Sequence, residues 1–299
     1  MSNLITKLGK IILPNPIMNA SGTYDLEETS CKIIPKLGAF VTKTITLKPC
    51  EGNLPPRIIE QEQGLLNSIG LQNPGIEVFL EKKLPSLQKL NSKIIVSIAG
   101  KNLEEYVDLS KILDKIPGII GLEINISCPN VKSGTIWAES PNKVYDLISK
   151  IRKSTSLFII TKFSPNVTDI KLIAKKAEQA GTDAISLINT IKGMAINLTT
   201  KKAVFDKKIG GLSGHCIKPI ALRLVWEVFS VVKVPIIGMG GIMNTEDALE
   251  FILAGASSLA IGTANFINPN TMLDIIKGIE KYLNKNKIKN IQELIGTLK

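Results

Sequence analysis

Eight short runs of apolar and β-branched residues recur along the chain, and they constrain its fold more than any other feature. Each run is almost continuously hydrophobic, as expected of parallel strands that are buried on both faces. Longer amphipathic stretches separate the runs, so strands and helices alternate, which is typical of an α/β fold. The predicted strands are Pro16–Ala20, Ala39–Thr44, Lys93–Ala99, Ile119–Ile126, Leu157–Phe163, Ala184–Ile188, Val234–Gly238 and Ser258–Ile261.

Capping residues mark several of the helices between these strands. The spacing of apolar residues predicts a helix over Leu103–Ile116. A second helix is predicted over Thr168–Ala180, with the Thr as its cap and Gly181 after its end. A third is predicted over Asn244–Ala254, with an Asn cap and a following glycine.

Repeated strand–helix units over 299 residues predict a single (β/α)8 TIM barrel that covers residues 1–299. The competing fold is an open doubly wound sheet. That fold would place Gly-x-Gly-x-x-Gly after the first strand, where this chain has Ala20-Ser21-Gly22-Thr23. We expect Ile5–Pro14 to form a hairpin under the barrel floor, and the Pro-rich stretch Leu47–Leu66 to lie beside the barrel mouth.

Charge and cysteine content argue against several classes of function. The formal net charge is +11, but Lys and Arg are dispersed, which favours solvated helix faces over a bias toward an anionic substrate or partner. Aromatic residues make up 5% of the chain, so no nucleic-acid stacking surface is expected. No cysteines have Cys-x-x-Cys spacing and His215 is the only histidine, so no metal site is expected. Without a long apolar run, we expect no membrane span and a cytoplasmic location.

Polar residues follow most of the predicted strands. In an α/β barrel the carboxyl ends of the strands meet at one mouth, where the chemistry of such enzymes lies. Singly, a strand-end Lys is more often a surface residue and a lone Cys a small buried one. Together they predict an active site, because stability does not require them at one mouth. These polar residues are Ser21, Lys43, Thr44, Asn67, Ser68, Ser97, Asn125, Cys128, Lys162, Asn189 and Thr190.

Two glycine runs follow the last two predicted strands. Gly240-Gly241 and Gly262-Thr263 stand where TIM barrels often bind a phosphate through backbone N–H groups. Tight turns are the alternative interpretation, but the paired placement favours a phosphate site.

The predicted site favours a flavin over other chemistries. It offers no carboxylate pair for glycoside hydrolysis and no histidine for a Ser-His-Asp triad. FMN fits, with its phosphate in the last two loops and its ring across the barrel mouth. Lys162 would then lie near the ring and favour the anionic reduced flavin.

Five motifs make the chain resemble class 1 dihydroorotate dehydrogenase over essentially its whole length. The Cys at position 128 is similar to class 1, since the membrane-associated class 2 enzymes have Ser there. The chain most resembles type B, the NAD-linked catalytic subunit, with fumarate-linked type A as the nearest alternative. The motifs are Val41-Thr42-Lys43-Thr44, Asn67-Ser68-Ile69-Gly70-Leu71-Gln72-Asn73-Pro74-Gly75, Asn125-Ile126-Ser127-Cys128-Pro129-Asn130, Asn189-Thr190 and Gly210-Gly211-Leu212-Ser213-Gly214.

The resemblance implies that the chain oxidises dihydroorotate to orotate in pyrimidine (UMP) biosynthesis. Cys128 would take the C5 proton while hydride passes from C6 to flavin N5, and Lys43 and Lys162 would complete the catalytic set. An ordinary thiol has a pKa of about 8.5, so it needs help to act as a base at neutral pH. The implied substrate contacts are Lys43, Asn67, Ser68, Ile69, Gly70, Leu71, Asn125, Asn189 and Thr190. The implied FMN contacts are Ser21, Lys43, Thr44, Ser97, Asn125, Lys162, Ile188, Gly214, Gly240, Gly241, Gly262 and Thr263.

The chain departs from the family pattern at two places. Ser97 stands where the family commonly has Asn, so its flavin contact would have a shorter reach. His215-Cys216 follows Gly214 where the family more often has Pro-Ala, which we interpret as local variation. The loop Val131–Ser140 is a candidate lid over the site, with an ordinary surface loop as the alternative.

Type B also implies partners. The chain has no iron–sulfur cysteine motif and no dinucleotide fingerprint, so a second subunit would carry FAD and a [2Fe-2S] cluster and pass electrons to NAD. A homodimer core within a heterotetramer follows from the resemblance. The alternatives to this function are another FMN barrel enzyme that acts on a dihydropyrimidine or dihydrouridine, and a binding barrel without redox chemistry.

Overall fold

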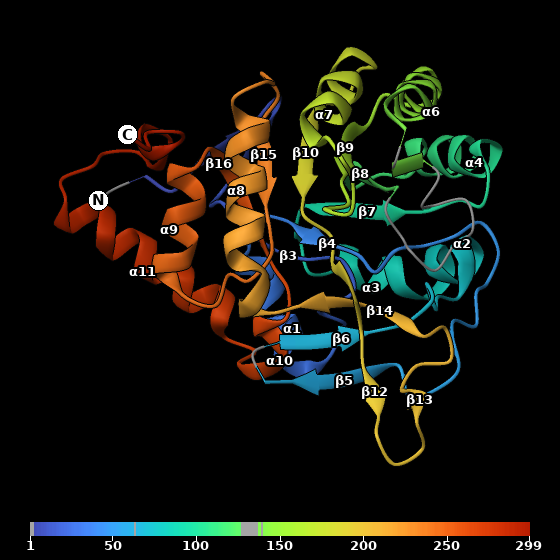
Figure 1. Cartoon of the computed structure of the whole chain (residues 1–299). Coiled ribbons are helices and arrows are strands. Elements are labelled where there is room, and N and C mark those ends of the chain that lie inside the picture. The colour runs from blue at the N-terminus through green and yellow to red at the C-terminus, as the bar shows by residue number, and fades with distance from the viewer. Residues whose placement is uncertain (1–2, 63, 127–136, 139) are drawn as a thin grey trace.

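Eight parallel strands of the computed structural model form one sheet that curls into a nearly closed barrel (Figure 1). The structure describes residues 3–62, 64–126, 137–138 and 140–299. Each strand falls within or overlaps one predicted run, so the TIM-barrel prediction is confirmed. The strands are β3 (Ile17–Asn19), β4 (Phe40–Val41), β7 (Ile94–Ile98), β8 (Ile119–Asn125), β9 (Phe158–Lys162), β10 (Ala184–Leu187), β15 (Ile236–Gly238) and β16 (Ala256–Ile261).

The barrel closes between its first two strands through few contacts. The backbone ladder there is a single parallel bridge between Met18 and Ala39. The buried side chain of Asn19 adds two bonds, because its Oδ1 accepts from Val41 N at 2.9 Å and its Nδ2 donates to Val41 O at 2.7 Å. A carboxamide can supply one donor and one acceptor at once, so it replaces a missing rung of the ladder.

An N-terminal hairpin seals the floor of the barrel, as predicted. Its strands β1 (Thr6–Leu8) and β2 (Ile11–Leu13) pair antiparallel. Leu8 and Leu13 are fully buried and pack in one cluster with Phe158 and other inward-facing side chains of the strands. The floor is therefore filled with apolar side chains, and the open end of the barrel is the opposite one.

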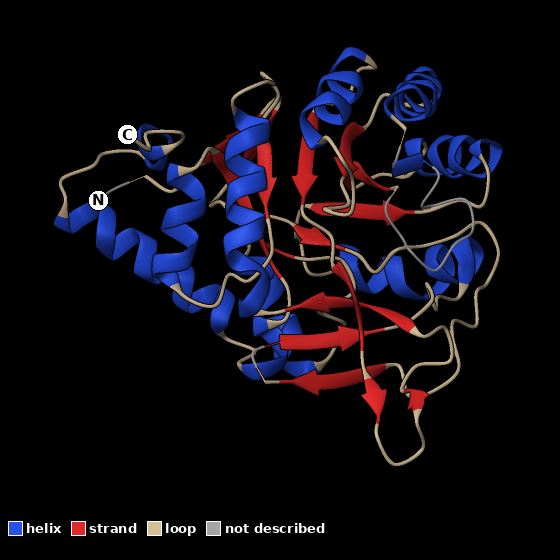
Figure 2. Cartoon of the chain, in the orientation of Figure 1, coloured by secondary structure: helices blue, strands red, loops and turns tan. Residues whose placement is uncertain are grey.

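Helices surround the strands (Figure 2). Consecutive outer helices pack against one another around the barrel. The helices and short helical turns are α1 (Glu28–Ile33), η1 (Ile34–Lys36), α2 (Gly75–Val78), the π-helical η2 (Phe79–Lys83), α3 (Leu84–Gln88), α4 (Leu103–Asp114), α6 (Pro141–Ser154), α7 (Ile170–Gln179), η3 (His215–Ile217), α8 (Lys218–Phe229), α9 (Thr245–Leu253), α10 (Ala264–Ile267), α11 (Thr271–Lys285) and η4 (Ile291–Leu294).

The helix caps confirm one sequence prediction and correct another. Asn244 caps α9, since its side chain accepts from Asp247 N, as predicted. The predicted Thr168 cap is wrong. Asp169 is the cap of α7 and accepts from the backbone N–H groups of Lys171 and Leu172. Asp and Thr both make good caps, so adjacent candidates are not separated by residue type.

A four-stranded antiparallel sheet stands at the open end of the barrel. Its strands lie in the order β11–β14–β6–β5, and they join two segments far apart in sequence. The arrowheads of β10 and β15 point toward this sheet, so it lies at the carboxyl ends of the barrel strands (Figure 1). The Pro-rich excursion is thus beside the mouth, as predicted, but it carries strands. The bounds are β5 (Ile58–Gln61), β6 (Gly64–Asn67), β11 (Ile191–Met194) and β14 (Ile209–Ser213), with β12 (Ile196–Asn197) and β13 (Lys202–Ala203) as a separate hairpin.

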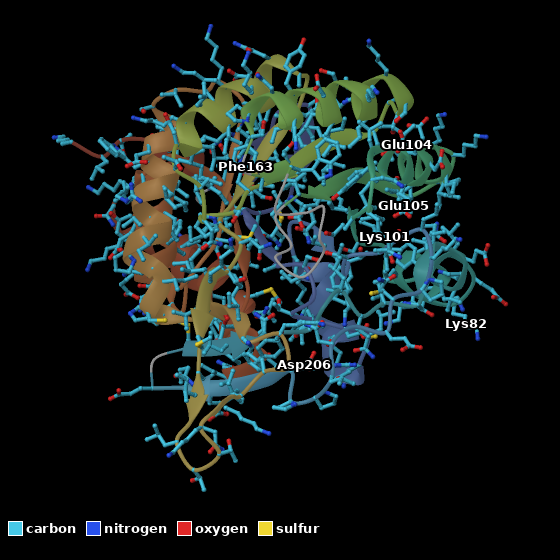
Figure 3. The ribbon with its side chains drawn as sticks, turned by 45° about the vertical axis from the view of Figure 1, so that its right-hand side comes forward. Lys82, Lys101, Glu104, Glu105, Phe163 and Asp206 are labelled. Carbon is cyan, nitrogen blue, oxygen red and sulfur yellow. The ribbon has the colours of Figure 1, made fainter. Side chains whose placement is uncertain are left out.

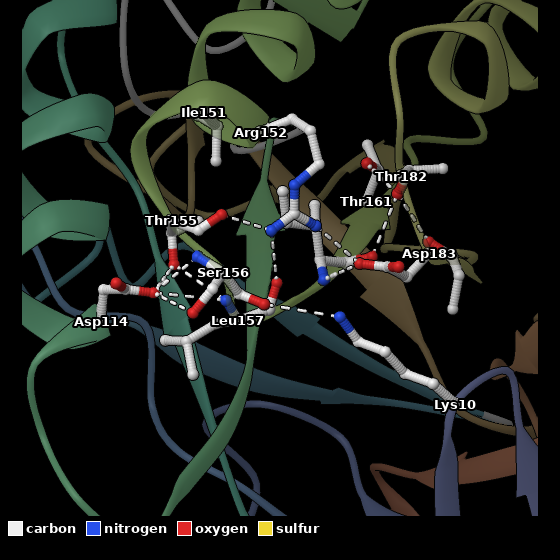
Figure 4. Close-up of polar contacts among 12 residues, drawn as sticks. Lys10, Asp114, Ile151, Arg152, Thr155, Ser156, Leu157, Thr161, Thr182 and Asp183 are labelled. Atoms are coloured by element: carbon white, nitrogen blue, oxygen red, sulfur yellow. Dashed lines mark hydrogen bonds and ion pairs between the residues drawn. The ribbon is translucent and has the colours of Figure 1, made fainter.

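A polar cluster fixes the start of β9 on the floor side (Figure 4). Asp114 accepts from Thr155 Oγ1 at 2.6 Å and from Ser156 N at 2.6 Å. Arg152 pairs with Asp183 at 2.8 Å, and it also donates to the Thr155 carbonyl. Five residues from α4, α6 and the segments that enter β9 and β10 thereby set where β9 begins, and so where Lys162 at its other end lies.

Charged side chains lie mostly on the outside of the helices, which agrees with their dispersed spacing in the sequence. Figure 3 shows Lys82, Lys101 and Glu104 pointing outward, whereas Phe163 lies inside. In the described part of the chain, no helix is long and apolar enough to cross a membrane.

Candidate active site at the barrel mouth

A cavity of about 400 Å³ opens at the carboxyl ends of the barrel strands, under the four-stranded sheet. This volume lies within the range of roughly 300–1,000 Å³ found for small-molecule sites. Most of the predicted site residues line it, although they come from nine separate segments of the chain. The predicted residues in its wall are Ser21, Lys43, Thr44, Asn67, Ile69, Gly70, Leu71, Asn125, Lys162, Ile188, Asn189, Thr190, Gly214, Gly240, Gly241, Gly262 and Thr263.

Hydrogen bonds hold the amide side chains of the cavity in place. Asn67 donates to the Gly211 carbonyl at 3.1 Å, at the position where β6 pairs with β14. The side chain of Asn125 donates to Thr44 Oγ1 at 3.3 Å, and the backbone carbonyl of Asn125 accepts from the Tyr106 hydroxyl at 2.9 Å. These bonds limit the motion of groups that face a ligand, as a pre-organised site requires.

Gly211 lets Thr190 reach the cavity wall. A Cβ added at Gly211 would overlap the Thr190 hydroxyl, so only glycine fits beside this side chain. Thr190 and Gly211 thus form a close contact between the loop after β10 and the sheet over the mouth. The position of Thr190, a predicted substrate contact, therefore depends on Gly211 in another segment of the chain.

The glycine run after β15 brings bare backbone to the cavity. Gly240 and Gly241 have φ angles of +120° and +78°, a region that disfavours other residues. A Cβ at Gly241 would stand 2.7 Å from the backbone nitrogen of Lys218 at the start of α8. On the other side, Thr263 Oγ1 donates to Ser213 Oγ at 2.9 Å. This wall of the cavity consists of backbone and hydroxyl groups, which suits a phosphate.

Lys43 reaches the cavity from the segment after β4. Its ammonium is accessible to solvent there, but partial burial among neighbouring protein atoms lowers its pKa. Repulsion from Lys83 and Arg57 lowers the pKa further, while the Asp25 carboxylate opposes the shift. The cavity therefore holds a lysine whose charge an anionic ligand would stabilise.

Lys162 faces the cavity from the end of β9 and has a carboxylate beneath it. Its Nζ lies 3.6 Å from Glu123 Oε1, and both side chains are almost completely buried. Among the described residues, no group of three or more His, Cys, Asp and Glu side chains is placed to hold a metal ion.

Two predicted contact residues lie behind the cavity wall. Ser68 is buried and accepts from Asn53 Nδ2 at 3.0 Å, so it supports the loop that carries Ile69 and Gly70. Ser97 is fully buried one layer below the mouth, where it bonds Thr44 and Glu123. Neither is part of the cavity wall.

The dihydroorotate dehydrogenase family model matches residues 3–283. The chain belongs to this family. A curated relative from Thermoanaerobacter pseudethanolicus is 50% identical over 300 residues, which cover 99% of each chain. A relative from Geotalea uraniireducens is 48% identical over 299 residues, 99% of this chain and 98% of its own. One from Desulforamulus reducens is 50% identical over 297 residues, 98% of each. All three are named dihydroorotate dehydrogenase B (NAD(+)), catalytic subunit.

Cys128, the predicted base, and residues 131–136 and 139 of the candidate lid lie outside the described residues. Within the dihydroorotate dehydrogenase fold, the structure does place the residue at the end of the preceding strand, because Asn125 ends β8 and lines the cavity. The assignment of Cys128 stays a prediction of the sequence.

Several cavity residues were not predicted. Two of them are polar, Thr23 and Ser213. Ser213 donates to the Leu65 carbonyl at 3.3 Å and accepts from Thr263. It stands inside the Gly210–Gly214 motif of the dihydroorotate dehydrogenases, so the motif itself marked it. Met239 and Phe266 are apolar, and no feature of their local sequence distinguishes them from core residues. The further lining residues are Ala20, Gly22, Ile58, Leu65, Gly211, Ile217, Ile242, Met243, Ala260 and Ala264.

Proposed function

We propose that this protein oxidises dihydroorotate to orotate with FMN bound at the barrel mouth, as a step of pyrimidine biosynthesis in the cytoplasm. The observation that carries the proposal is the convergence of Lys43, Asn125 and Lys162 with two glycine-rich loops around one cavity. Relatives about half identical over nearly the whole chain bear the name of this activity, which supports it.

The cavity wall fits FMN in its chemistry. Backbone at Gly240, Gly241 and Gly262 and the hydroxyl of Thr263 suit the phosphate, and apolar Ile188 suits a flat ring. The polar side chains that would hold the isoalloxazine are Ser21, Lys43, Thr44, Asn125 and Lys162. When bound, FMN supplies the hydride acceptor for the reaction.

The substrate is an anion with ring amides, and the other side of the cavity matches it. Lys43 offers a cation for the carboxylate, and Asn67, Asn125 and Asn189 offer amide groups that both donate and accept. Thr190 and the backbone of Gly70 and Leu71 complete this side. We propose Cys128 as the base that removes the C5 proton, on the sequence motif alone.

A partner would take the electrons onward. The relatives are named catalytic subunits of NAD(+)-linked enzymes, which supports a second subunit for this chain too. We propose that this subunit carries FAD and a [2Fe-2S] cluster and passes electrons to NAD, around a homodimer of the present chain. Efficient fumarate reduction by the purified chain alone would instead identify a type A enzyme.

Anaerobic bleaching of the bound flavin by dihydroorotate tests the proposal. The purified protein should be yellow and lose its visible absorption when dihydroorotate is added without oxygen. Cys128→Ala should slow this bleaching by about 10²–10⁴-fold, the range for a lost general base. Cys31→Ala is the matched control, since Cys31 is a free thiol in α1 and not part of the cavity wall. A colourless protein would exclude a flavoenzyme, and full-rate bleaching by Cys128→Ala would exclude the base.

A further inference from the structure

Glu123 is a buried carboxylate inside the barrel that the proposed reaction does not use. It is 3% exposed, and among the described residues the other buried charged side chains are Lys162 and Asp247. Asp247 belongs to an outer helix and pairs with Lys218. Glu123 and Lys162 therefore form the charged pair of the barrel interior, next to the cavity.

The strand registers stack the pair in two layers. Glu123 of β8 lies beside Ser97 of β7 in the lower layer. Lys162 of β9 lies beside Asn125 of β8 on one side and Ser186 of β10 on the other, in the layer above, and Lys162 and Asn125 line the cavity. Side chains at positions 123 and 125 share one face of the strand, so the carboxylate points at the ammonium from below.

Both oxygens of Glu123 have partners that fix their direction. Oε1 accepts from Ser97 Oγ at 3.1 Å and faces Lys162 Nζ at 3.6 Å. Oε2 accepts from Ser186 Oγ at 3.2 Å. Ser97 is in turn within 3.0 Å of the Thr44 hydroxyl, which lines the cavity. The carboxylate is thus held by three strands and cannot turn away from the lysine without losing these bonds.

Stability alone does not explain such a pair. Burial of two charges costs solvation that their attraction rarely exceeds, and a well-packed apolar pair is often as stable. Here Lys162 lines the cavity, and Glu123 lies behind the cavity wall in contact with it. This arrangement indicates that the pair serves to fix the charge of Lys162 next to the cavity.

We propose that Glu123 is a positioning residue that keeps Lys162 charged and aimed into the cavity whether the bound flavin is oxidised or reduced. This inference rests on the proposed FMN site. A buried amine without an anion nearby favours its neutral form. The Glu123 carboxylate lies 3.6 Å from Nζ of Lys162, so it attracts the ammonium form of the lysine in either state of the flavin.

The pH dependence of the flavin midpoint potential tests this assignment. For a two-electron couple, each proton taken up adds about 30 mV per pH unit to the slope. In Glu123→Gln, Lys162 should take up a proton when the flavin becomes anionic, so the slope should be steeper than in the wild type by about 30 mV per pH unit over part of the range. Among the described residues, the charged groups in or directly behind the cavity wall are Glu123, Lys162 and Lys43. The slope is therefore also measured for Lys43→Met, alone and combined with Glu123→Gln, to find any contribution of Lys43 to it.

Ser258→Ala is the matched control. Ser258 is fully buried, lies on β16 away from the pair, and its hydroxyl has no hydrogen-bond partner among the described residues. The slope of this variant should equal that of the wild type. Equal slopes for the wild type and Glu123→Gln would overturn the proposal, as would a change in slope that persists when Lys162 is Met.

Unfolding of the flavin-free protein gives a second test that does not need the cofactor. Urea denaturation of the wild type, Glu123→Gln, Lys162→Met and the double variant should show that the two substitutions are not additive, with the double variant more stable than their sum predicts. Additive losses would refute the pairing itself. Failure of dihydroorotate to bleach the flavin, with these couplings intact, would count against the proposed function and not against the role of Glu123.

Discussion

The side chain of Asn19 bonds both backbone groups of Val41 and so joins the two strands where the barrel closes. Its Oδ1 accepts from Val41 N at 2.9 Å and its Nδ2 donates to Val41 O at 2.7 Å. Beside it lie the backbone bridge between Met18 and Ala39 and a bond from Gly38 N to Ile17 O at 2.7 Å. A single carboxamide therefore carries much of the seam between β3 and β4.

Asn19→Ala should lower the free energy of unfolding by about 2–4 kcal/mol, because it leaves a buried N–H and a buried C=O without partners. Urea denaturation measures the loss. Exposed Asn270 makes no side-chain cap bond at the start of α11, so Asn270→Ala should stay within about 0.5 kcal/mol of the wild type. Equal effects of the two substitutions would show that the seam does not depend on Asn19.

Gly211→Ala should weaken orotate binding about tenfold or more while FMN stays bound. The added methyl group would displace the Thr190 side chain, which we propose to contact the substrate. Titration of the holoprotein with orotate measures the change. In Gly193→Ala, on the neighbouring strand of the same sheet, the new Cβ would meet the flexible end of Leu66 at 2.9 Å, so binding should change little. Unaltered binding by Gly211→Ala would remove Thr190 from the substrate site.

Orotate affinity should fall as the pH rises through the lowered pKa of Lys43. Partial burial, followed by repulsion from Lys83, places this pKa below the ordinary 10.5, so the charge is lost at a lower alkaline pH than for an ordinary lysine. An anion binds the charged form, so affinity is constant below this pKa and falls by up to about tenfold per pH unit above it. Lys43→Met should bind weakly with no such fall. A parallel decline in both proteins would assign the titration to another group.

Asp114→Asn should destabilise the protein by about 1 kcal/mol at neutral pH, after allowance for solvent screening. The Thr155 hydroxyl is the main cause that lowers the pKa of Asp114 below 3.8, burial opposes it, and bonds from Ser156 and Leu157 add to the lowering. A lowered carboxyl pKa contributes stability above the unfolded value, and this stability is lost as the pH falls through the folded value. The difference between the two proteins should therefore shrink in acid below pH 3.8. A difference that does not vary with pH would place the effect in the hydrogen bonds alone.

The strands and the helix caps were predictable because their causes are local. Continuous apolar runs predict β7 and β9 to within one residue at each end. Asn244 predicts the start of α9 because its side chain caps the helix. The run at Ala39–Thr44 is the weakest case, since β4 spans Phe40–Val41. Beyond Val41 the backbone still bonds to β7, from Thr42 N to Ile95 O, but Lys43 and Thr44 line the cavity and the regular ladder ends.

The site residues were predictable as a set of strand ends, since a closed parallel barrel brings all carboxyl ends to one mouth. Which of them line the cavity and which lie behind its wall was not predictable. Ser97 follows an apolar residue as Asn125 does, and Ser68 directly follows Asn67, yet both serines lie behind the cavity wall. The difference depends on side-chain length and on the stagger of neighbouring strands, and neither is visible in one segment alone.

The sequence by itself determined the α/β class, the eight strands and the types of residue that reach the mouth, because periodicity and turn chemistry act within a few residues. The tertiary structure decided which residues meet. Closure through Asn19, the contact of Thr190 with Gly211, and the pairing of Glu123 with Lys162 all join separate segments of the chain. Such contacts depend on the register of strand against strand, which is set only when the whole barrel packs around its core.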